Sequence, residues 1–201
     1  MIQKVLGNLS EGLLFVVSAP AGTGKTTLVR LLTKNFPCVV ESVSCTTRVP
    51  RPGEEEGKDY FFVTRKEFEA KKKQGDFLEN AEVFGHCYGT SKEFVDSQRK
   101  LGKHVILVID TQGALHLQAL KVEATYIFIA PPDFEVLRER LLGRKTDSKE
   151  ENEERLAWSH KEMELSVLYD FFIINSELEI AYEVLKSILI AEEHKIKKYT
   201  N

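Results

Sequence analysis

Residues 13–28 read LLFVVSAPAGTGKTTL, and this stretch decides how the rest of the chain is interpreted. Its apolar part, residues 13–17, predicts a buried β-strand, and the turn that follows contains two closely spaced glycines. Lys25-Thr26-Thr27 then opens an amphipathic helical pattern. The order is typical of the phosphate-binding loop G-x-x-x-x-G-K-[ST]. The alternative is an ordinary glycine-rich turn, which the position of the motif between a strand and a helix disfavours.

This loop predicts a site for a nucleoside triphosphate. Gly22 and Gly24 keep the backbone open, so that successive N–H groups can point at a phosphate, and the helix N-terminus adds partial positive charge. We expect Lys25 to reach the β- and γ-phosphates and the Thr26 hydroxyl to bind Mg²⁺. Ala19 stands where a glycine is usual, and it fits if its φ is negative, because only a positive φ demands glycine. The residues expected to bind the nucleotide are Ala19, Pro20, Ala21, Gly22, Thr23, Gly24, Lys25, Thr26 and Thr27.

Length and composition limit the possible classes of protein. The chain has 201 residues, which predicts one domain, and 42% of them are hydrophobic, enough for a sizeable core. A formal net charge of −3 gives no indication of a nucleic-acid or membrane-surface binder. Cys38, Cys45 and Cys87 are odd in number and lack metal-binding spacing, so we expect reduced thiols in a cytoplasmic protein. No apolar run approaches the length of a membrane helix, and no feature specifies an oligomeric state.

Strands and helices alternate along most of the chain, which predicts a parallel sheet with helices on both faces. Further buried strands are expected at residues 38–43, 104–109, 125–130 and 171–174. The β-rich residues 44–90 interrupt this alternation and predict a small inserted lobe. Within it, Thr64 and Glu67 form a capping box, and Gly85 and Gly89 are expected to bracket a turn. A second capping box is predicted at residues 176–179.

The inserted lobe supplies candidates for binding a second anionic substrate. Arg48 and Arg51 lie close to prolines in the sequence. A guanidinium group can bind phosphate oxygens through two parallel hydrogen bonds. Proline lowers the entropic cost of ordering the loop. The Glu79 carboxylate can accept the N1–H and the 2-amino group of guanine, and Ser44 or Thr90 can donate to O6. Adenine lacks those donors and would leave a buried carboxylate unpaired. The alternative is a solvated loop with a structural Arg–Glu pair.

The sequence resembles the guanylate kinase family through SAPAGTGKTTL, TTRVPRPGEEEGKDYFFV, FLENAEVFGHCYGTS and IDTQG, and the resemblance covers residues 13–193. It implies a single domain over residues 1–201 with a P-loop NTPase-type α/β fold: a parallel sheet flanked by helices. The implied parts are a core of residues 1–43, 91–139 and 169–201, a GMP-binding lobe of residues 44–90 and a helical lid of residues 140–168. The implied reaction transfers the γ-phosphoryl group of ATP to GMP, giving ADP and GDP. Mg²⁺ would accompany ATP, and dGMP is a further candidate acceptor.

By position in these motifs, the resemblance also implies roles for individual residues. The implied GMP-binding residues are Ser44, Arg48, Arg51, Tyr60, Glu79, Tyr88, Thr90 and Asp110. The implied catalytic residues are Lys25, Arg51, Arg140, Arg144 and Arg155, and the implied metal ligand is Thr26. Phosphoryl transfer between two anionic nucleotides needs charge neutralisation and positioning, which such a set of cations supplies. The alternative for the three lid arginines is a solvated helix face.

Departures from the family pattern and competing functions narrow these expectations. Val108 stands where many relatives have an aspartate, so we expect Asp110 to be at most an outer-shell partner of Mg²⁺. Guanylate-kinase-like domains of scaffold proteins use the same lobe to bind phosphorylated peptides, usually with a degraded phosphate loop, which this chain does not have. A kinase for another nucleoside monophosphate is the remaining alternative, and Glu79 is the residue that discriminates against it.

Overall fold

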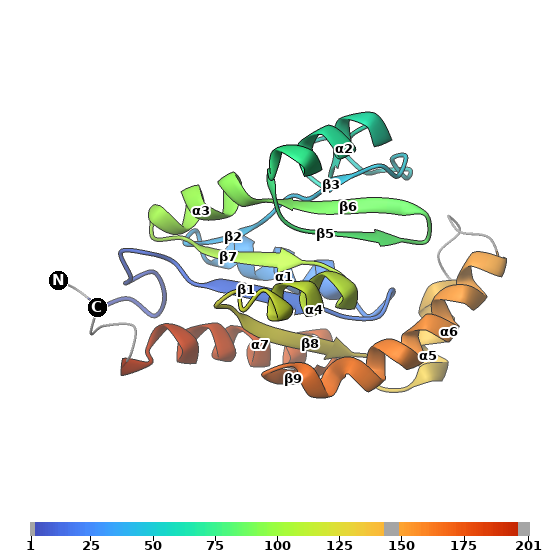
Figure 1. Ribbon diagram of the computed structural model, residues 1–201. Coiled ribbons are helices and arrows are strands. Elements are labelled where there is room, and N and C mark those ends of the chain that lie inside the picture. Colours follow the sequence, from blue (N-terminus) through green and yellow to red (C-terminus); the bar gives the residue numbers. More distant parts are fainter. Residues whose placement is uncertain (1–2, 143–148, 197–201) are drawn as a thin grey trace.

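The computed structural model describes residues 3–142 and 149–196, and its core is a five-stranded, all-parallel sheet (Figure 1). The strand order is β2-β7-β1-β8-β9. The strands are β1 (Leu14–Ser18), β2 (Val39–Glu41), β7 (His104–Val108), β8 (Thr125–Ala130) and β9 (Phe171–Ile174). These strands are apolar along most of their length because helices cover both faces of the sheet. The predicted parallel α/β core is therefore confirmed.

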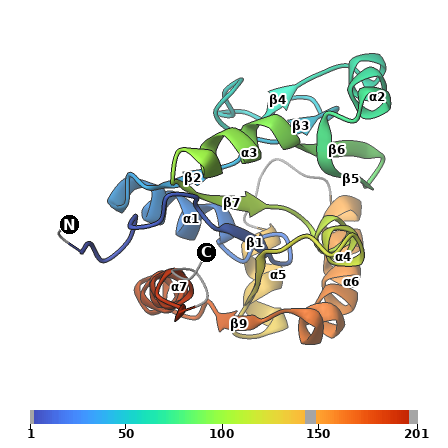
Figure 2. The same ribbon diagram turned by 60° about the vertical axis from the view of Figure 1, so that its left-hand side comes forward.

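Two pairs of helices cover the two faces of this sheet (Figure 2). On one face Phe15 and Ile127 pack against α1 (Lys25–Asn35) and α7 (Leu178–Glu193). On the other, Val16 and Leu107 pack against α3 (Lys92–Lys100) and α4 (Thr111–Ala119). Beyond the carboxyl ends of the strands lie α5 (Phe134–Leu142) and α6 (Lys149–Leu165), the latter followed by the 3-10 turn Ser166–Leu168 (Figure 1). Among the described residues, no helix has both the length and the apolar character needed to span a membrane.

A second, four-stranded sheet of order β4-β3-β6-β5 lies above the core and is covered by α2 (Arg65–Gln74). Its strands are β3 (Cys45–Thr46), β4 (Phe61–Phe62), β5 (Phe77–Val83) and β6 (His86–Ser91). The tight turn predicted here is present at Phe84 and Gly85, but its second predicted boundary is wrong, because Gly89 lies inside β6. The ring of Phe77 covers Gly89, and a Cβ there would lie 2.9 Å from it, so the glycine serves aromatic packing within the sheet.

The two predicted capping boxes have different outcomes. At the start of α2 the box is complete: the Glu67 N–H donates to Thr64 Oγ1 (3.2 Å), and the Thr64 N–H donates to Glu67 Oε2 (2.7 Å). The box predicted at Ser176 is wrong, because α7 begins after Glu177 and has no side-chain cap. The Asn175 N–H still bonds to the Ala130 carbonyl (2.9 Å), so the ladder of the sheet extends too far for a helix to start at Ser176.

A buried polar cluster fastens the chain at the amino end of the sheet. The Glu193 carboxylate of α7 accepts the N–H of Gly7 (2.7 Å), the N–H of Asn8 (3.0 Å) and the Nε2–H of His104. His104 Nδ1 accepts the Leu13 N–H (3.0 Å), which places the imidazole proton on Nε2. Burial lowers the pKa of His104, and although burial acts the other way on Glu193, these donors hold the pKa of Glu193 below its ordinary value.

Replacing Glu193 with alanine is expected to lower the free energy of unfolding by about 2–4 kcal/mol, because buried N–H groups lose their acceptor. The loss should be measurable by urea denaturation, with kcat within about twofold of the wild type because the cluster lies at the amino end of the strands. Glu183→Ala, an exposed position on the same helix, is the control. In the wild type the free energy of unfolding should decline as the pH falls below 6.5, because the unfolded chain then protonates His104 more readily than the native protein does. Wild-type stability in the Glu193→Ala protein would contradict this role.

Candidate active site

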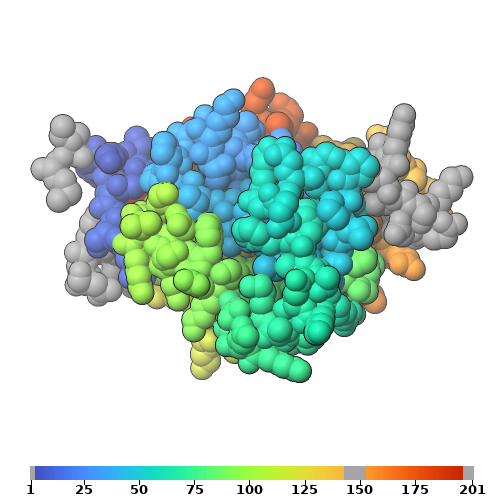
Figure 3. Space-filling view, turned by 90° about the horizontal axis from the view of Figure 1, so that it is seen from above, coloured from blue at the N-terminus to red at the C-terminus, as the bar shows by residue number. Residues whose placement is uncertain are grey.

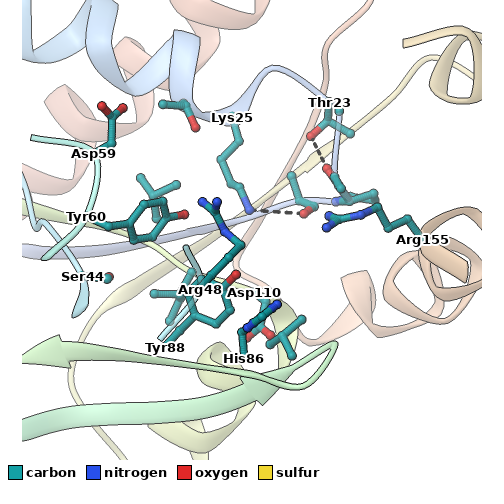
Figure 4. Close-up of a pocket in the computed structure, with 18 of the residues that line it drawn as sticks. Thr23, Lys25, Ser44, Arg48, Asp59, Tyr60, His86, Tyr88, Asp110 and Arg155 are labelled. Atoms are coloured by element: carbon teal, nitrogen blue, oxygen red, sulfur yellow. Dashed lines mark hydrogen bonds between the residues drawn. The ribbon is translucent and has the colours of Figure 1, made fainter. Parts of the chain in front are cut away.

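A cavity of about 530 Å³ opens at the carboxyl end of the parallel sheet, where parallel sheets place their ligands. Its walls come from the phosphate loop, the second sheet and α6, and the close-up in Figure 4 shows side chains from all three converging. In Figure 3, which views the molecule from above, the second sheet and α2 lie beside α3. The second sheet and α2, here called the lobe, therefore cover part of the core. The site therefore lies between the two sheets.

All nine residues predicted for the phosphate loop line this cavity. Gly22 and Gly24 have φ values of 91° and 89°, which glycine adopts without strain. Ala19 is absent from the positive-φ residues of the described chain, so its substitution for glycine is accommodated as expected. Lys25 Nζ lies 3.4 Å from the Ala19 carbonyl oxygen, and Thr23 Oγ1 donates to the Pro20 carbonyl (2.8 Å), which ties the loop to itself (Figure 4).

Asn175, at the end of β9, supports the phosphate loop from behind. Its buried side chain donates to the Thr23 carbonyl (2.6 Å), and a Cβ on Gly24 would lie 2.6 Å from the same Nδ2. The Asn175 carbonyl in turn lies 3.3 and 3.4 Å from the two terminal nitrogens of Arg140. Arg140 is thus held beside the loop and does not line the cavity, whereas Arg155 on α6 does. Arg144 lies outside the described residues.

Glu54 holds together residues 48–54 of the lobe, here called the arginine loop. Its carboxylate accepts two bonds from Arg48 Nη2 (2.8 and 3.0 Å) and one from the Arg51 N–H (2.7 Å). Burial opposes ionisation, but these donors together hold the pKa of Glu54 below its ordinary value. The guanidinium of Arg48 also lies over the Tyr60 ring, 5.4 Å from its centroid, and Tyr60 meets Tyr88 edge to face. Glu54 is not among the residues predicted from the sequence, although the structural Arg–Glu pair offered there as an alternative is present.

Glu79 lies on β5 with only 3% of its surface exposed. Thr90, its neighbour on β6, donates from Oγ1 to Glu79 Oε1 (2.7 Å) and stands behind the carboxylate, outside the cavity lining. Burial and the nearby charge of Asp110 raise the pKa of Glu79 to about 7, against the Thr90 hydrogen bond. Asp110 caps α4 by accepting the Gly113 N–H (2.8 Å), and its Oδ2 has no hydrogen-bond partner within the described chain.

The remaining residues predicted for the second substrate also line the cavity, namely Ser44, Arg48, Arg51, Tyr60, Tyr88 and Asp110. Several lining residues are not predicted from the sequence. Arg30 of α1 forms an ion pair with Asp59 of the lobe, so it joins the two walls. Glu41 ends β2, and Glu162 lies on α6; burial raises the pKa of each to about 7. A polar residue at the end of a parallel strand is a signal that could have identified Glu41. Glu162 offers no such signal, because only packing decides which face of α6 is buried.

Comparisons with known proteins agree with this geometry. A family model described as guanylate kinase matches residues 12–192. The guanylate kinase of Protochlamydia amoebophila is 58% identical over 96% of this chain and 97% of its own length. That of Geobacter sulfurreducens is 49% identical over 91% and 90%. The crystal structure of guanylate kinase from Anaplasma phagocytophilum superposes with a TM-score of 0.78 at 35% identity, over 94% of this chain and 89% of that one. The chain belongs to the guanylate kinase family.

Proposed function

We infer that this protein is a nucleoside monophosphate kinase that transfers the γ-phosphoryl group of ATP to GMP and releases ADP and GDP. The observation that carries this inference is one cavity with a phosphate loop on one wall and a buried carboxylate, Glu79, on another. The loop suits a triphosphate, and the carboxylate suits the two adjacent N–H donors of guanine. Arg48 and Arg51 line the same cavity and suit the acceptor's phosphate.

On the donor side, we propose that the loop backbone, the N-terminus of α1 and Lys25 hold the ATP phosphates. All three would direct positive charge at the same phosphates. A helix N-terminus binds anions through its partial positive charge and its free N–H groups. The residues present also fit Mg²⁺: Thr26 lines the cavity, and Asp110 offers the buried Oδ2 oxygen, which has no hydrogen-bond partner among the described residues. Thr26 would hold the ion directly and Asp110 through water, and the ion would neutralise charge on the β- and γ-phosphates.

On the acceptor side, Glu79 would accept the N1–H and the 2-amino group, and Ser44 would donate to O6. Thr90 would keep Glu79 oriented through its 2.7 Å hydrogen bond. Tyr60 and Tyr88 would add neutral donors around the GMP phosphate. Proposed further members of this site are Arg48, Arg51 and Asp110.

Around the group in transfer, Lys25, Arg51 and Arg155 would neutralise the charge shared by the two nucleotides. We propose that Arg140 and Arg144 join them when a lid of residues 140–168 closes over a core of residues 1–43, 91–139 and 169–201. The lobe of residues 44–90 would close from the other side. Closure would exclude water, which otherwise would hydrolyse ATP. The GMP phosphate oxygen attacks the γ-phosphorus directly, so no side-chain nucleophile is required.

The thiols support a proposal for the cellular compartment. Cys38, Cys45 and Cys87 are all free, and Cys45 and Cys87 are buried in the second sheet. Reduced, buried cysteines suit a reducing compartment, so we propose that the enzyme acts in the cytoplasm on ATP, GMP and, as a further acceptor, dGMP.

The test is ADP release from ATP and Mg²⁺ with each of GMP, dGMP, AMP, UMP and CMP, against a sample without acceptor. We expect kcat/KM for GMP to exceed that for AMP, UMP and CMP by at least about a hundredfold. Equal rates with AMP or UMP would refute the assignment of the base. ADP release that does not depend on any acceptor would refute phosphoryl transfer to a nucleotide.

Arg51→Ala should raise the KM for GMP about tenfold to a hundredfold and change the KM for ATP much less, because charge-assisted hydrogen bonds to the acceptor's phosphate are lost. Initial-rate kinetics with each substrate varied in turn measure the two constants. Lys58→Ala removes a cation from an exposed position in the same segment, 64% exposed, and should leave both constants unchanged. An unchanged KM for GMP in Arg51→Ala would remove Arg51 from the phosphate site.

A further inference from the structure

Gly113, the third residue of α4, lies against the Glu79 carboxylate. A Cβ built on Gly113 would lie 2.7 Å from Glu79 Oε2, closer than real Cβ contacts come, and 3.3 Å from Glu79 Cδ and from Asp110 Oδ1. The first turn of α4 therefore packs on β5 with room for a hydrogen atom and for nothing larger. Both carboxylates proposed for the acceptor site meet at this one glycine.

Neither the backbone nor the helix requires glycine here. Gly113 is not among the residues with a positive φ, so an L-residue can adopt its conformation. Alanine is a better helix former than glycine in the body of a helix. The Gly113 N–H donates to Asp110 Oδ1 (2.8 Å), but any residue other than proline can supply that donor. The remaining reason for glycine is space beside Glu79.

The Glu79 side chain cannot move away from a new Cβ at Gly113 without shifting its carboxylate from the observed position. Thr90 holds Oε1 at 2.7 Å from one side, and the side chain is almost fully enclosed, so displacement from Gly113 pushes Oε2 off the position that Thr90 defines. We propose that Gly113 is a positioning residue for base specificity: the absence of a side chain there sets where the Glu79 carboxylate meets the purine. This inference rests on the proposed function, in which Glu79 reads guanine.

The displacement should be visible in the choice between two purines. GMP offers Glu79 both N1–H and the 2-amino group, whereas IMP offers only N1–H. A correctly placed carboxylate gains binding energy from the 2-amino group, and a displaced carboxylate gains less. Loss of stability alone would lower the activity with both acceptors by the same factor and leave their ratio unchanged.

The experiment compares Gly113→Ala with the wild type, using kcat/KM for GMP and for IMP and the KM for ATP. We expect kcat/KM for GMP to fall at least tenfold, the GMP:IMP ratio to fall with it, and the KM for ATP to stay within about twofold. His116→Ala, at an exposed position of the same helix, is the control and should leave all three unchanged. A wild-type GMP:IMP ratio in folded Gly113→Ala would overturn the proposal.

A double-mutant cycle with Glu79→Ala tests whether Gly113 acts through Glu79. Because the truncated side chain no longer meets the new Cβ, Gly113→Ala should cost less than about twofold in the Glu79→Ala background. An equal cost in both backgrounds would overturn the proposal. If the single variant does not fold, recovery of folding in the double variant supports the same contact, and an unfolded double variant contradicts it.

The outcomes separate this inference from the proposed function. A wild-type protein that phosphorylates AMP as fast as GMP would refute the reading of guanine and the role of Gly113 with it. A wild-type GMP:IMP ratio in Glu79→Ala would do the same. A selective wild type and an unselective Glu79→Ala, combined with a fully selective Gly113→Ala, would refute the role of Gly113 alone.

Discussion

Replacing Lys25 with alanine is expected to lower kcat by about two to three orders of magnitude without unfolding the protein, a loss typical of removing one preorganised group that stabilises charge in the transition state. Lys25 is the first residue of α1, and its side chain lies in the cavity beside the loop backbone. The charge that it would meet on the β- and γ-phosphates grows on the leaving oxygen as the γ-phosphoryl group departs.

The measurement is kcat with both substrates saturating, together with GMP binding followed by calorimetry. GMP affinity should change little, because Lys25 belongs to the phosphate loop and not to the arginine loop of the lobe. Lys34→Ala, an exposed lysine in the last turn of the same helix, removes the same charge and should leave kcat unchanged. A folded Lys25→Ala protein that keeps more than a tenth of wild-type turnover would contradict this role.

Replacing Glu79 with glutamine is expected to lower kcat/KM for GMP by about two to three orders of magnitude and to change the KM for ATP little. The amide presents a donor where guanine also presents donors, so one favourable hydrogen bond becomes an unfavourable contact in a buried site. The preference for GMP over AMP should fall with it. Glu82→Gln is the matched control, because Glu82 lies on the same strand, is half exposed and pairs with Arg65. Unchanged selectivity in Glu79→Gln would show that another group reads the base.

The raised pKa of Glu79 gives this prediction a pH dependence. Because the free protein holds the pKa of Glu79 at about 7, the ionised form that would accept both guanine donors is lost as the pH falls through 7. Below that value kcat/KM for GMP should decline, and GMP binding near pH 7 should release protons, since the guanine donors stabilise the carboxylate. The Glu79→Gln protein should lack this limb of the profile. An identical limb in that protein would assign it to other groups, such as Glu41 or Glu162.

The same shift predicts that Glu79 lowers stability. Its pKa is raised in the native state from an ordinary value of 4.5, so the native protein binds the proton more tightly than the unfolded chain does. The free energy of unfolding therefore falls as the pH rises from about 4.5 to 7, and the loss is complete above 7. At pH 8 Glu79→Gln should be more stable than the wild type by on the order of 1–3 kcal/mol, measured by urea denaturation. A destabilised variant would show that the carboxylate is better satisfied than its burial suggests.

Local sequence predicts the elements whose cause is local. The strand predicted at residues 13–17 appears within one residue of its expected position, and the strands β8 and β9 appear at theirs. The box at Thr64 is complete, because apolar runs and caps involve only neighbouring residues. Strand β6 is not predicted because its residues are polar or small and owe their conformation to pairing with β5. The box at Ser176 is wrong for a related reason: the hydrogen bond from Asn175 to β8 decides where α7 can begin.

The candidate site divides in the same way. The phosphate loop and the pair Arg48 and Arg51 are recognisable in the sequence, because each needs particular residue types at short spacing. Glu79 lies far from both, and it is recognisable through the resemblance of its own stretch, FLENAEVFGHCYGTS, to the family. Glu54 and Glu162 are not recognisable, because which carboxylate faces a cavity depends on how distant segments pack.

The sequence by itself determined the phosphate loop, the parallel core and the residue types proposed to meet two anionic nucleotides, since these follow from short-range spacing and apolar periodicity. Only the tertiary structure decided that Glu54 binds Arg48, that Asn175 supports the loop and that Gly113 lies against Glu79. The physical reason is that each of these contacts joins groups that only folding brings together. In such contacts, burial and close approach set the charge and the position of a side chain, and its neighbours in the sequence do not.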